Sequence, residues 1–237
     1  MKRFALAGRF AGDTAAIGVD NGLLHHRPLP AVAAPPAVAW GEPAARVAIV
    51  ALFTFMAMRI GADFIHTGRI TGLLLVASEA LVVILTVFRR PPLAVDRSIR
   101  ARIVTGLSLI GPSLVMPASV AALWPAIATV AISACGLLVV ISGKLSLGRS
   151  FGLMPANRGV VSTGIYRVVR HPIYLGYLIT HVGFLAANPI IWNVLTLGAA
   201  DVVLLIRAVC EERTLARDVA YRAYQAQVRW RVLPGVF

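Results

Sequence analysis

Charged side chains are scarce in this chain: only 14% of its 237 residues are Asp, Glu, Lys or Arg, while 58% are hydrophobic. In a soluble domain about a quarter of the residues are charged. This chain therefore has too little charge to cover a water-soluble globule of its length. We expect lipid to solvate most of its surface, as in an all-α polytopic membrane bundle of about six transmembrane helices.

Cysteine is almost absent, which excludes several kinds of site. The two cysteines, Cys135 and Cys210, lie within or at the end of apolar runs. They form no CxxC pair and no metal-ligand spacing, so neither a disulfide framework nor a metal centre is expected. Thiols in such positions usually behave as small buried hydrophobic side chains.

Acidic residues are also few, 10 against 23 Lys and Arg, which leaves a formal net charge of +13. Nucleic-acid-binding proteins spread basic residues over a solvated face. Here the arginines lie between apolar runs, where cytoplasmic membrane loops carry them to set orientation and to meet anionic lipid. We therefore expect the bilayer, and no nucleic acid, as the partner of this charge. The arginine- and alanine-rich composition is typical of bacterial proteins, which predicts a bacterial inner membrane.

Six apolar stretches follow an N-terminal region, residues 1–42, that is rich in proline and glycine and is expected to form a flexible cytoplasmic arm. In the third stretch, Gly111-Pro112 predicts a kink. Between the fifth and sixth, Asn188-Pro189 predicts a tight helical hairpin. The stretches lie at about 44–62, 70–88, 101–117, 121–142, 172–187 and 190–209. The first four occupy a predicted membrane region at 43–142.

Arginine-bearing loops alternate with uncharged ones along the chain. Arginines are present at 89–102, at 143–171 and after 207, whereas 118–120 and 188–189 have no charge. The positive-inside rule then places both termini and 143–171 in the cytoplasm. Only the loop at 62–69, flanked by Arg59 and Arg69, weakens this pattern.

The segment 143–171 is too long and too glycine-rich to be a simple connector. It ends in a cluster of Tyr166, His171 and Tyr174, and Pro172 is suited to a first helical position. Helix starts favour anionic groups of a ligand. The alternative interpretation is an interfacial belt of Tyr and Arg that anchors a helix end.

A second polar cluster closes the sixth stretch. Arg207 and Glu211 are four residues apart and so share one helical face. Adjacent Glu211 and Glu212 are electrostatically unfavourable at a helix C-terminus, which suggests a specific role. The alternative interpretation is a surface ion-pair cluster that contributes little to stability.

Together these motifs resemble the isoprenylcysteine carboxyl methyltransferase family, which is similar to the membrane phospholipid N-methyltransferases. The resemblance covers roughly residues 143–237 and includes a final Leu233-Pro234. It rests on the order and spacing of these groups: Gly164-Ile-Tyr166, Arg170-His-Pro-Ile-Tyr174, Asn188-Pro189, Arg207-x-x-x-Glu211-Glu212 and Tyr221-x-x-Tyr224.

The resemblance implies an S-adenosylmethionine-dependent methyltransferase that acts on a lipophilic acceptor at the cytoplasmic face. Arg207 would be the catalytic, acceptor-facing residue. The C-terminal region would form the cofactor pocket, with these binding residues: Arg158, Gly159, Val160, Val161, Tyr166, His171, Pro172, Ile173, Tyr174, Glu211 and Glu212. The acceptor stays open among a prenylcysteine carboxylate, a phospholipid amine and a small thiol.

Two other functions remain possible from the sequence. Membrane sterol and isoprenoid reductases, which bind NADPH, resemble the same C-terminal pattern. A small transporter is the alternative without an enzyme activity. It would use the ionisable residues inside the apolar stretches, Glu79, His181 and Asp201, because such groups are functional candidates.

Overall fold

The computed structural model describes residues 41–67, 70–96, 98–116 and 120–237, which belong to one compact unit. The predicted arm at 1–42 lies outside these ranges apart from its last two residues, which begin the first helix. The described part is mostly helical, which agrees with the predicted fold class. The α-helices are α1 (Gly41–Thr67), α2 (Ile70–Phe88), α3 (Ile99–Ile110), α4 (Ala126–Leu147), α5 (Pro172–Ala187), α6 (Ile191–Leu215) and α7 (Val219–Gln227).

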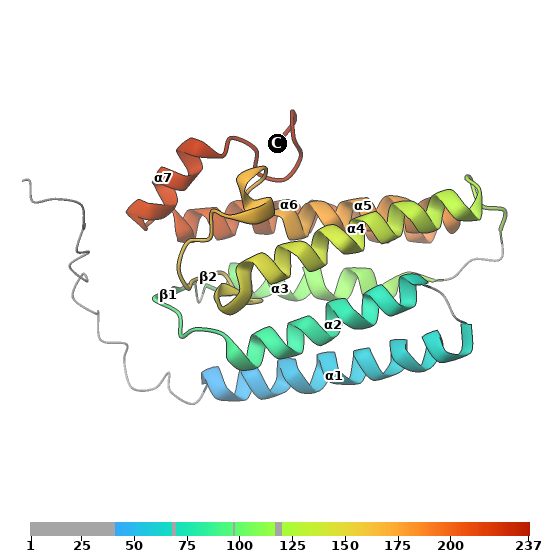
Figure 1. Ribbon diagram of the computed structural model, residues 1–237, viewed down its shortest axis with the longest axis horizontal. Helices are drawn as coiled ribbons and strands as arrows, with labels where there is room; N and C mark the ends of the chain where they lie inside the picture. The colour runs from blue at the N-terminus through green and yellow to red at the C-terminus, as the bar shows by residue number, and fades with distance from the viewer. Residues whose placement is uncertain (1–40, 68–69, 97, 117–119) are drawn as a thin grey trace, which may run out of the picture. The chain divides into compact units, whose positions relative to one another are not determined.

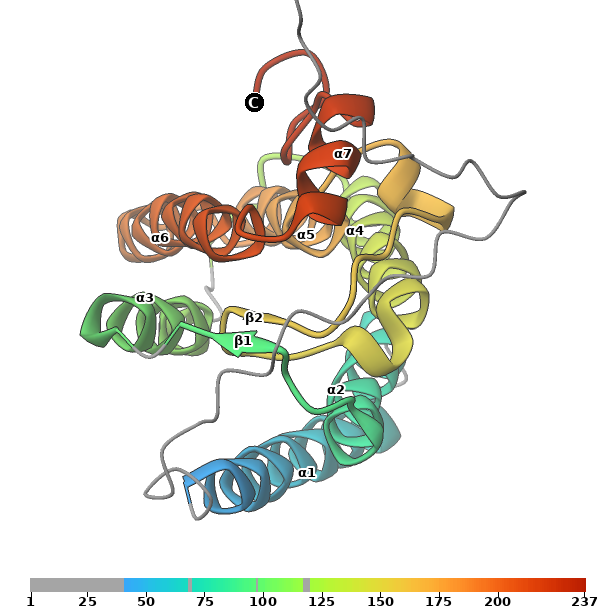
Figure 2. The ribbon, with the colours of Figure 1, turned by 90° about the vertical axis from the view of Figure 1, so that its left-hand side faces the viewer.

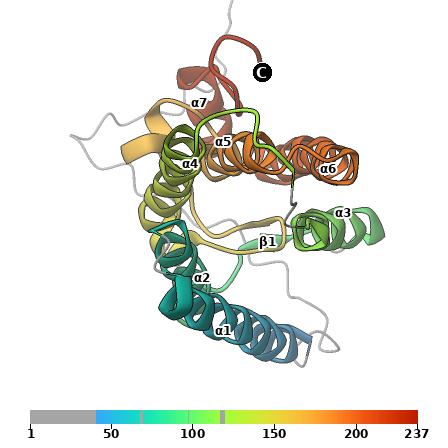
Figure 3. The same cartoon turned by 90° about the vertical axis from the view of Figure 1, so that its right-hand side faces the viewer.

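Six of these helices run side by side (Figure 1). Seen end on, they form an arc in the order α1, α2, α4, α5, α6, α3, with α7 above α5 (Figures 2 and 3). The third helix of the chain thus leaves the sequence order and packs against α6. The arc surrounds an inner space to which helices from both halves of the chain contribute.

Glycines allow α4 and α5 to pack closely. A Cβ on Gly176 would lie 2.6 Å from the carbonyl oxygen of Gly136, and one on Gly183 would collide with the Ser133 hydroxyl. Small residues at such contacts let helix backbones approach in membranes, where packing rather than the hydrophobic effect drives association. The contact fixes the start of α5 beside the end of α4.

Short backbone pairings join distant segments at one end of the helices. The strands β1 (Ala94–Val95) and β2 (Ala156–Asn157) are antiparallel and connect the loop after α2 to the segment after α4. Near the start of α5, the Arg170 and His171 amides donate to the carbonyls of Trp230 and Arg231, at 2.9 and 2.8 Å. The segment 143–171 is therefore held between the N-terminal helices and the C-terminal tail.

Among the described residues, two helical segments are long and apolar enough to cross a membrane, Ala126–Ser150 and Ile191–Leu215. Shorter apolar helices are Arg46–Phe55, Leu74–Phe88 and Pro172–Ala187. Large apolar side chains point outward from α6, as shown by Ile191, which is 72% exposed. These features agree with a membrane protein, while the count of six spans stays a prediction.

The third and fourth predicted stretches have other bounds in the structure. The third stretch does not continue through a kink: α3 ends at Ile110, and a 3-10 turn, η2 (Gly111–Leu114), follows. The fourth stretch begins later and runs to Leu147, so Lys144 lies in a helix rather than in the loop. The sixth helix runs to Leu215 and includes the Glu211-Glu212 pair, as the polar cluster that closes it predicted. Lys144 can be buried in a helix because its ammonium donates to the Ser78 carbonyl and hydroxyl oxygens at 2.9 and 2.7 Å.

Candidate active site

A cavity of about 730 Å³ lies within the arc of helices. Residues from α1 to α7 and from the segment between α4 and α5 line it. Among the predicted site residues, Pro172 and Glu212 do not line the cavity. Those that do are Arg158, Gly159, Val160, Val161, Tyr166, His171, Ile173, Tyr174, Arg207 and Glu211. The structure thus brings residues 158–174 of the loop and helix start together with the end of α6.

The start of α5 presents two stacked rings to the cavity. Pro172 occupies the first turn, and His171 precedes it as the N-cap residue. The His171 and Tyr174 rings stack with centroids 5.2 Å apart and an 11° interplanar angle. The Tyr174 hydroxyl donates to Glu211 Oε1 at 2.6 Å. This bond ties α5 to α6 at the cavity wall.

Arg207 is held in place by several partners at the cavity wall. Its Nε donates to Glu211 Oε1 at 3.1 Å, as the four-residue spacing predicted. Its Nη1 donates to the Ser108 hydroxyl on α3 at 2.9 Å, and its Nη2 donates to the Leu153 carbonyl. The guanidinium also lies 5.5 Å from the centroid of the Tyr174 ring. Arg207 therefore joins three segments of the chain and is only 5% exposed.

Glu212 faces away from the cavity, towards the C-terminal tail. Its carboxylate accepts from Arg170 Nε at 2.7 Å and from Arg231 Nε at 2.8 Å. His171 Nε2 lies 3.2 Å from Glu212 Oε1, and Gln225 donates from 3.3 Å. The geometry gives Glu212 a positioning role, because it fastens α5 and the tail to α6.

Three tyrosines form an aromatic wall at the α7 end of the cavity. Tyr224 donates through its hydroxyl to the Tyr166 carbonyl at 2.7 Å, and the Tyr221 and Tyr224 rings meet edge on at 5.6 Å. Burial raises the pKa of Tyr224 to about 12 and that of Tyr166 well above its ordinary value, so both stay neutral. The site prediction did not include Tyr221 and Tyr224. Their three-residue spacing on an amphipathic helix was the signal for them.

The loop after β2 brings backbone to the cavity. Gly159 has a φ of 100°, a conformation that glycine adopts without strain. Its amide donates to Asn157 Oδ1 at 2.9 Å, and Asn157 Nδ2 donates to Asp218 Oδ2 at 2.7 Å. These bonds position the loop so that the Val160 and Val161 side chains lie at the cavity.

Residues outside the predicted methyltransferase site also line the cavity, and several of them lie in the first half of the chain. Ser78 and Glu79 on α2 line it, as do Ser108 on α3 and His181 on α5. His181 Nδ1 lies 2.6 Å from Asp201 Oδ1 on α6. Within the described ranges, no group of three or more His, Cys, Asp or Glu side chains is arranged to hold a metal ion.

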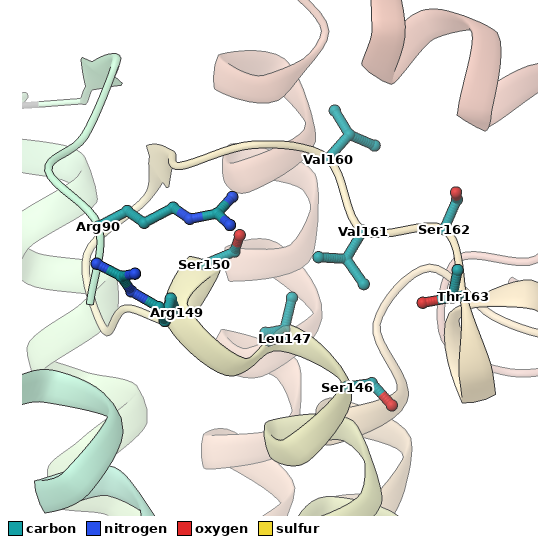
Figure 4. A pocket seen from close by; sticks show the side chains of 9 residues that line it. All are labelled: Arg90, Ser146, Leu147, Arg149, Ser150, Val160, Val161, Ser162 and Thr163. Atoms are coloured by element: carbon teal, nitrogen blue, oxygen red, sulfur yellow. The ribbon is translucent and has the colours of Figure 1, made fainter. Parts of the chain in front are cut away.

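A smaller pocket of about 320 Å³ adjoins the cavity and shares Leu147, Ser150, Val160 and Val161 with it. Figure 4 shows the Arg90 side chain extending towards Ser150, with Val160 and Val161 on the opposite wall. The rest of the lining is polar: Arg149, Ser146, Ser162 and Thr163. This pocket therefore offers guanidinium and hydroxyl groups beside a largely apolar cavity.

Comparison with known proteins identifies one part of the chain. Residues 124–222 match the model of a family described as phospholipid methyltransferase. The curated proteins give no match to this chain. The matched segment begins just before α4 and ends within α7, so it contains the predicted site residues, whereas α1 to α3 lie outside it.

Proposed function

We propose that this membrane protein transfers a methyl group from S-adenosylmethionine to a lipophilic acceptor, because residues 124–222, which contain the candidate site, match the phospholipid methyltransferase family model. The cofactor would supply a methyl group on a sulfonium, already activated for displacement. The protein then needs to hold both partners in line and to exclude water.

The Glu211 carboxylate beside the tyrosine wall is the observation that carries this proposal. S-adenosylmethionine has a sulfonium and an ammonium, which pair well with a carboxylate and with neutral aromatic faces. Glu211 is held in place by Tyr174 and Arg207. Tyr166, Tyr221 and Tyr224 line the same end of the cavity. Its volume of about 730 Å³ leaves room for the cofactor and part of an acceptor.

The remaining contacts follow from the same arrangement. Gly159 would bring backbone close to the cofactor, and Val160 and Val161 would supply apolar contact. The adjoining pocket, with Arg90 and Arg149, suits the cofactor's carboxylate, because guanidinium groups bind carboxylates through paired hydrogen bonds. We propose that the acceptor binds in the part of the cavity that lies between Arg207 and the membrane helices.

A cavity enclosed by membrane helices would suit a lipophilic acceptor. Apolar residues of α1, α2, α3 and α5 line its inner part, whereas the polar site residues lie near the ends of α4 and α6. We propose that this polar end faces the cytoplasm, where S-adenosylmethionine is made available. The arginines there, among them Arg90, Arg149 and Arg213, agree with the positive-inside rule.

Ligand-dependent unfolding of the purified full-length protein tests the proposal. S-adenosylhomocysteine should raise the unfolding temperature, since a ligand at about 100 times its dissociation constant adds roughly 2.7 kcal/mol. NADPH is the matched control and should give no shift. Stabilisation by NADPH and not by S-adenosylhomocysteine would replace the methyltransferase with a reductase. A methyl-labelled cofactor, followed by mass spectrometry of extracted lipids, would then identify the acceptor.

A further inference from the structure

Glu79 is a buried carboxylate with one oxygen that the described residues leave unsatisfied. It lies on α2, is 9% exposed and lines the large cavity. Its Oε2 atom is buried and has no hydrogen-bond partner among the described residues. Leaving a buried charged or polar oxygen without a donor costs free energy, commonly several kcal/mol. Such a group inside a membrane protein is a functional candidate.

Lys144 does not supply the missing hydrogen bond. Lys144 is fully buried, and its ammonium donates to the carbonyl and hydroxyl oxygens of Ser78, the residue before Glu79. Its positive charge still acts on Glu79. Lys144 therefore balances the charge of the carboxylate and leaves an oxygen of Glu79 able to accept a hydrogen bond.

The part of the cavity around Glu79 is apolar and continuous with the candidate active site. Phe53, Leu75 and Leu137 line it near α2. Tyr177 on α5 lines the same cavity as Glu79 and Arg207. A molecule bound against Glu79 would thus occupy the same cavity as a ligand of Glu211.

We propose that Glu79 binds the polar head of a lipophilic molecule and that this head is a neutral hydrogen-bond donor of the hydroxyl type. A donated hydrogen bond would satisfy Glu79 Oε2, while the apolar lining would take up the hydrocarbon body. A carboxylate head would be repelled by Glu79. An ammonium head would add a net charge beside Glu79, because Lys144 already balances that carboxylate.

This inference rests on the proposed function only in identifying the bound molecule as the methyl acceptor. On that basis the acceptor is a lipophilic alcohol or phenol rather than a carboxylic acid. Glu79 would then be a specificity-determining residue from outside the segment that matches the family. The N-terminal helices would choose the acceptor, while residues 158–211 would hold the cofactor.

Binding of dodecanol to the full-length protein in detergent micelles tests this site without any turnover. Dodecane and dodecanoate have the same chain length as dodecanol. Dodecane lacks a hydrogen-bond donor, and dodecanoate carries a negative charge. We expect dodecanol alone to raise the unfolding temperature. Replacing Glu79 should weaken its binding in the order Glu, Gln, Met, by about tenfold to a hundredfold for Glu79→Met, because a hydrogen bond to a charged group is lost. Asp201→Asn is the matched control, since Asp201 is an intramembrane carboxylate with its own partner, and it should leave dodecanol binding unchanged.

Equal binding of dodecanol by the wild type, Glu79→Gln and Glu79→Met would overturn the site, and so would tighter binding of dodecanoate. If Glu79→Met does not fold, the Glu79→Gln variant decides, because the amide is a weaker acceptor of similar size. S-adenosylhomocysteine is measured on the same preparations. Dodecanol binding that depends on Glu79, without any response to S-adenosylhomocysteine, would support the site and reject the proposed methyltransferase. The reverse result would reject the site alone.

Discussion

Glu211 and Glu212 are neighbours in the chain, yet their carboxylates serve different parts of the molecule. Glu211 lines the cavity and accepts from Tyr174 and Arg207. Glu212 lies outside the cavity and accepts from Arg170 and Arg231. A helix turns by about 100° per residue, so adjacent side chains point to different surroundings. Replacing each glutamate separately should therefore separate ligand binding from stability.

Glu211→Gln should weaken binding of S-adenosylmethionine strongly while the protein stays folded. The change removes the charged partner of a cationic ligand in a partly desolvated site, which typically costs about 2–5 kcal/mol. Isothermal titration calorimetry with S-adenosylhomocysteine and S-adenosylmethionine measures the loss. Unchanged affinity for both would reduce Glu211 to a structural ion-pair partner of Arg207.

Glu212→Gln should instead lower stability. The side chain is 6% exposed, and its charge balances Arg170 and Arg231. Removing one partner of a buried ion pair costs roughly 3 kcal/mol or more. Denaturant unfolding in detergent would show a lower midpoint, with cofactor affinity retained in the folded fraction. A variant with wild-type stability but no affinity would place Glu212 in the cofactor site after all.

Arg207→Lys should reduce methyl transfer more than cofactor affinity. A lysine ammonium lacks the planar fork with which Arg207 reaches Glu211, Ser108 and the Leu153 carbonyl together. Ser108→Ala is the milder control, because it removes one of these contacts and keeps the guanidinium. Turnover and calorimetric affinity are measured on the same preparations. Equal losses of both in Arg207→Lys would mean that Arg207 acts only by positioning Glu211.

Gly176→Ala should destabilise the contact between α4 and α5. The added Cβ would lie 2.6 Å from the Gly136 carbonyl oxygen and 2.8 Å from the Val140 amide nitrogen, both backbone atoms that cannot move freely. Overpacking of this kind costs about 1–3 kcal/mol. Gly198→Ala on α6 is the control, because no atom lies within 4 Å of its Cβ, and alanine favours helix by about 1 kcal/mol. Similar unfolding temperatures for the two variants would contradict the close packing of these helices.

Reporter fusions after residue 120 and after residue 237 should fall on opposite sides of the membrane. Three apolar helices, α4, α5 and α6, and the short α7 separate the two positions. The arginines after α4 and after α6 favour the cytoplasm for the C-terminus. Activity of both reporters on one side would exclude a crossing by all three helices.

Local features of the sequence were predicted well. The fifth stretch at 172–187 matches α5 residue for residue, since Pro172 marks its start and Asn188-Pro189 its end. The pairing of Arg207 with Glu211 also follows from sequence, because residues four apart share a helical face. Both predictions depend only on residues close together in the chain. Their backbone preferences and helical spacing can be interpreted without knowing which distant segment packs against them.

Only the tertiary structure decides which distant segments of the chain come into contact. The sequence placed no partner beside Arg207 except Glu211, whereas α3 lies against α6 and brings Ser108 to it across 99 residues. The sequence places Lys144 in a loop. In the structure Lys144 lies in α4, and its ammonium can be buried because Ser78 on α2 supplies two oxygens that accept its hydrogen bonds. Helices in lipid are apolar on every face. The apolar pattern of the sequence therefore predicts where the helices lie in the chain but not which helices pack against one another. Those neighbours are set by small residues such as Gly136 and Gly176, which permit close approach, and by the few polar side chains that must find donors or acceptors inside the bundle.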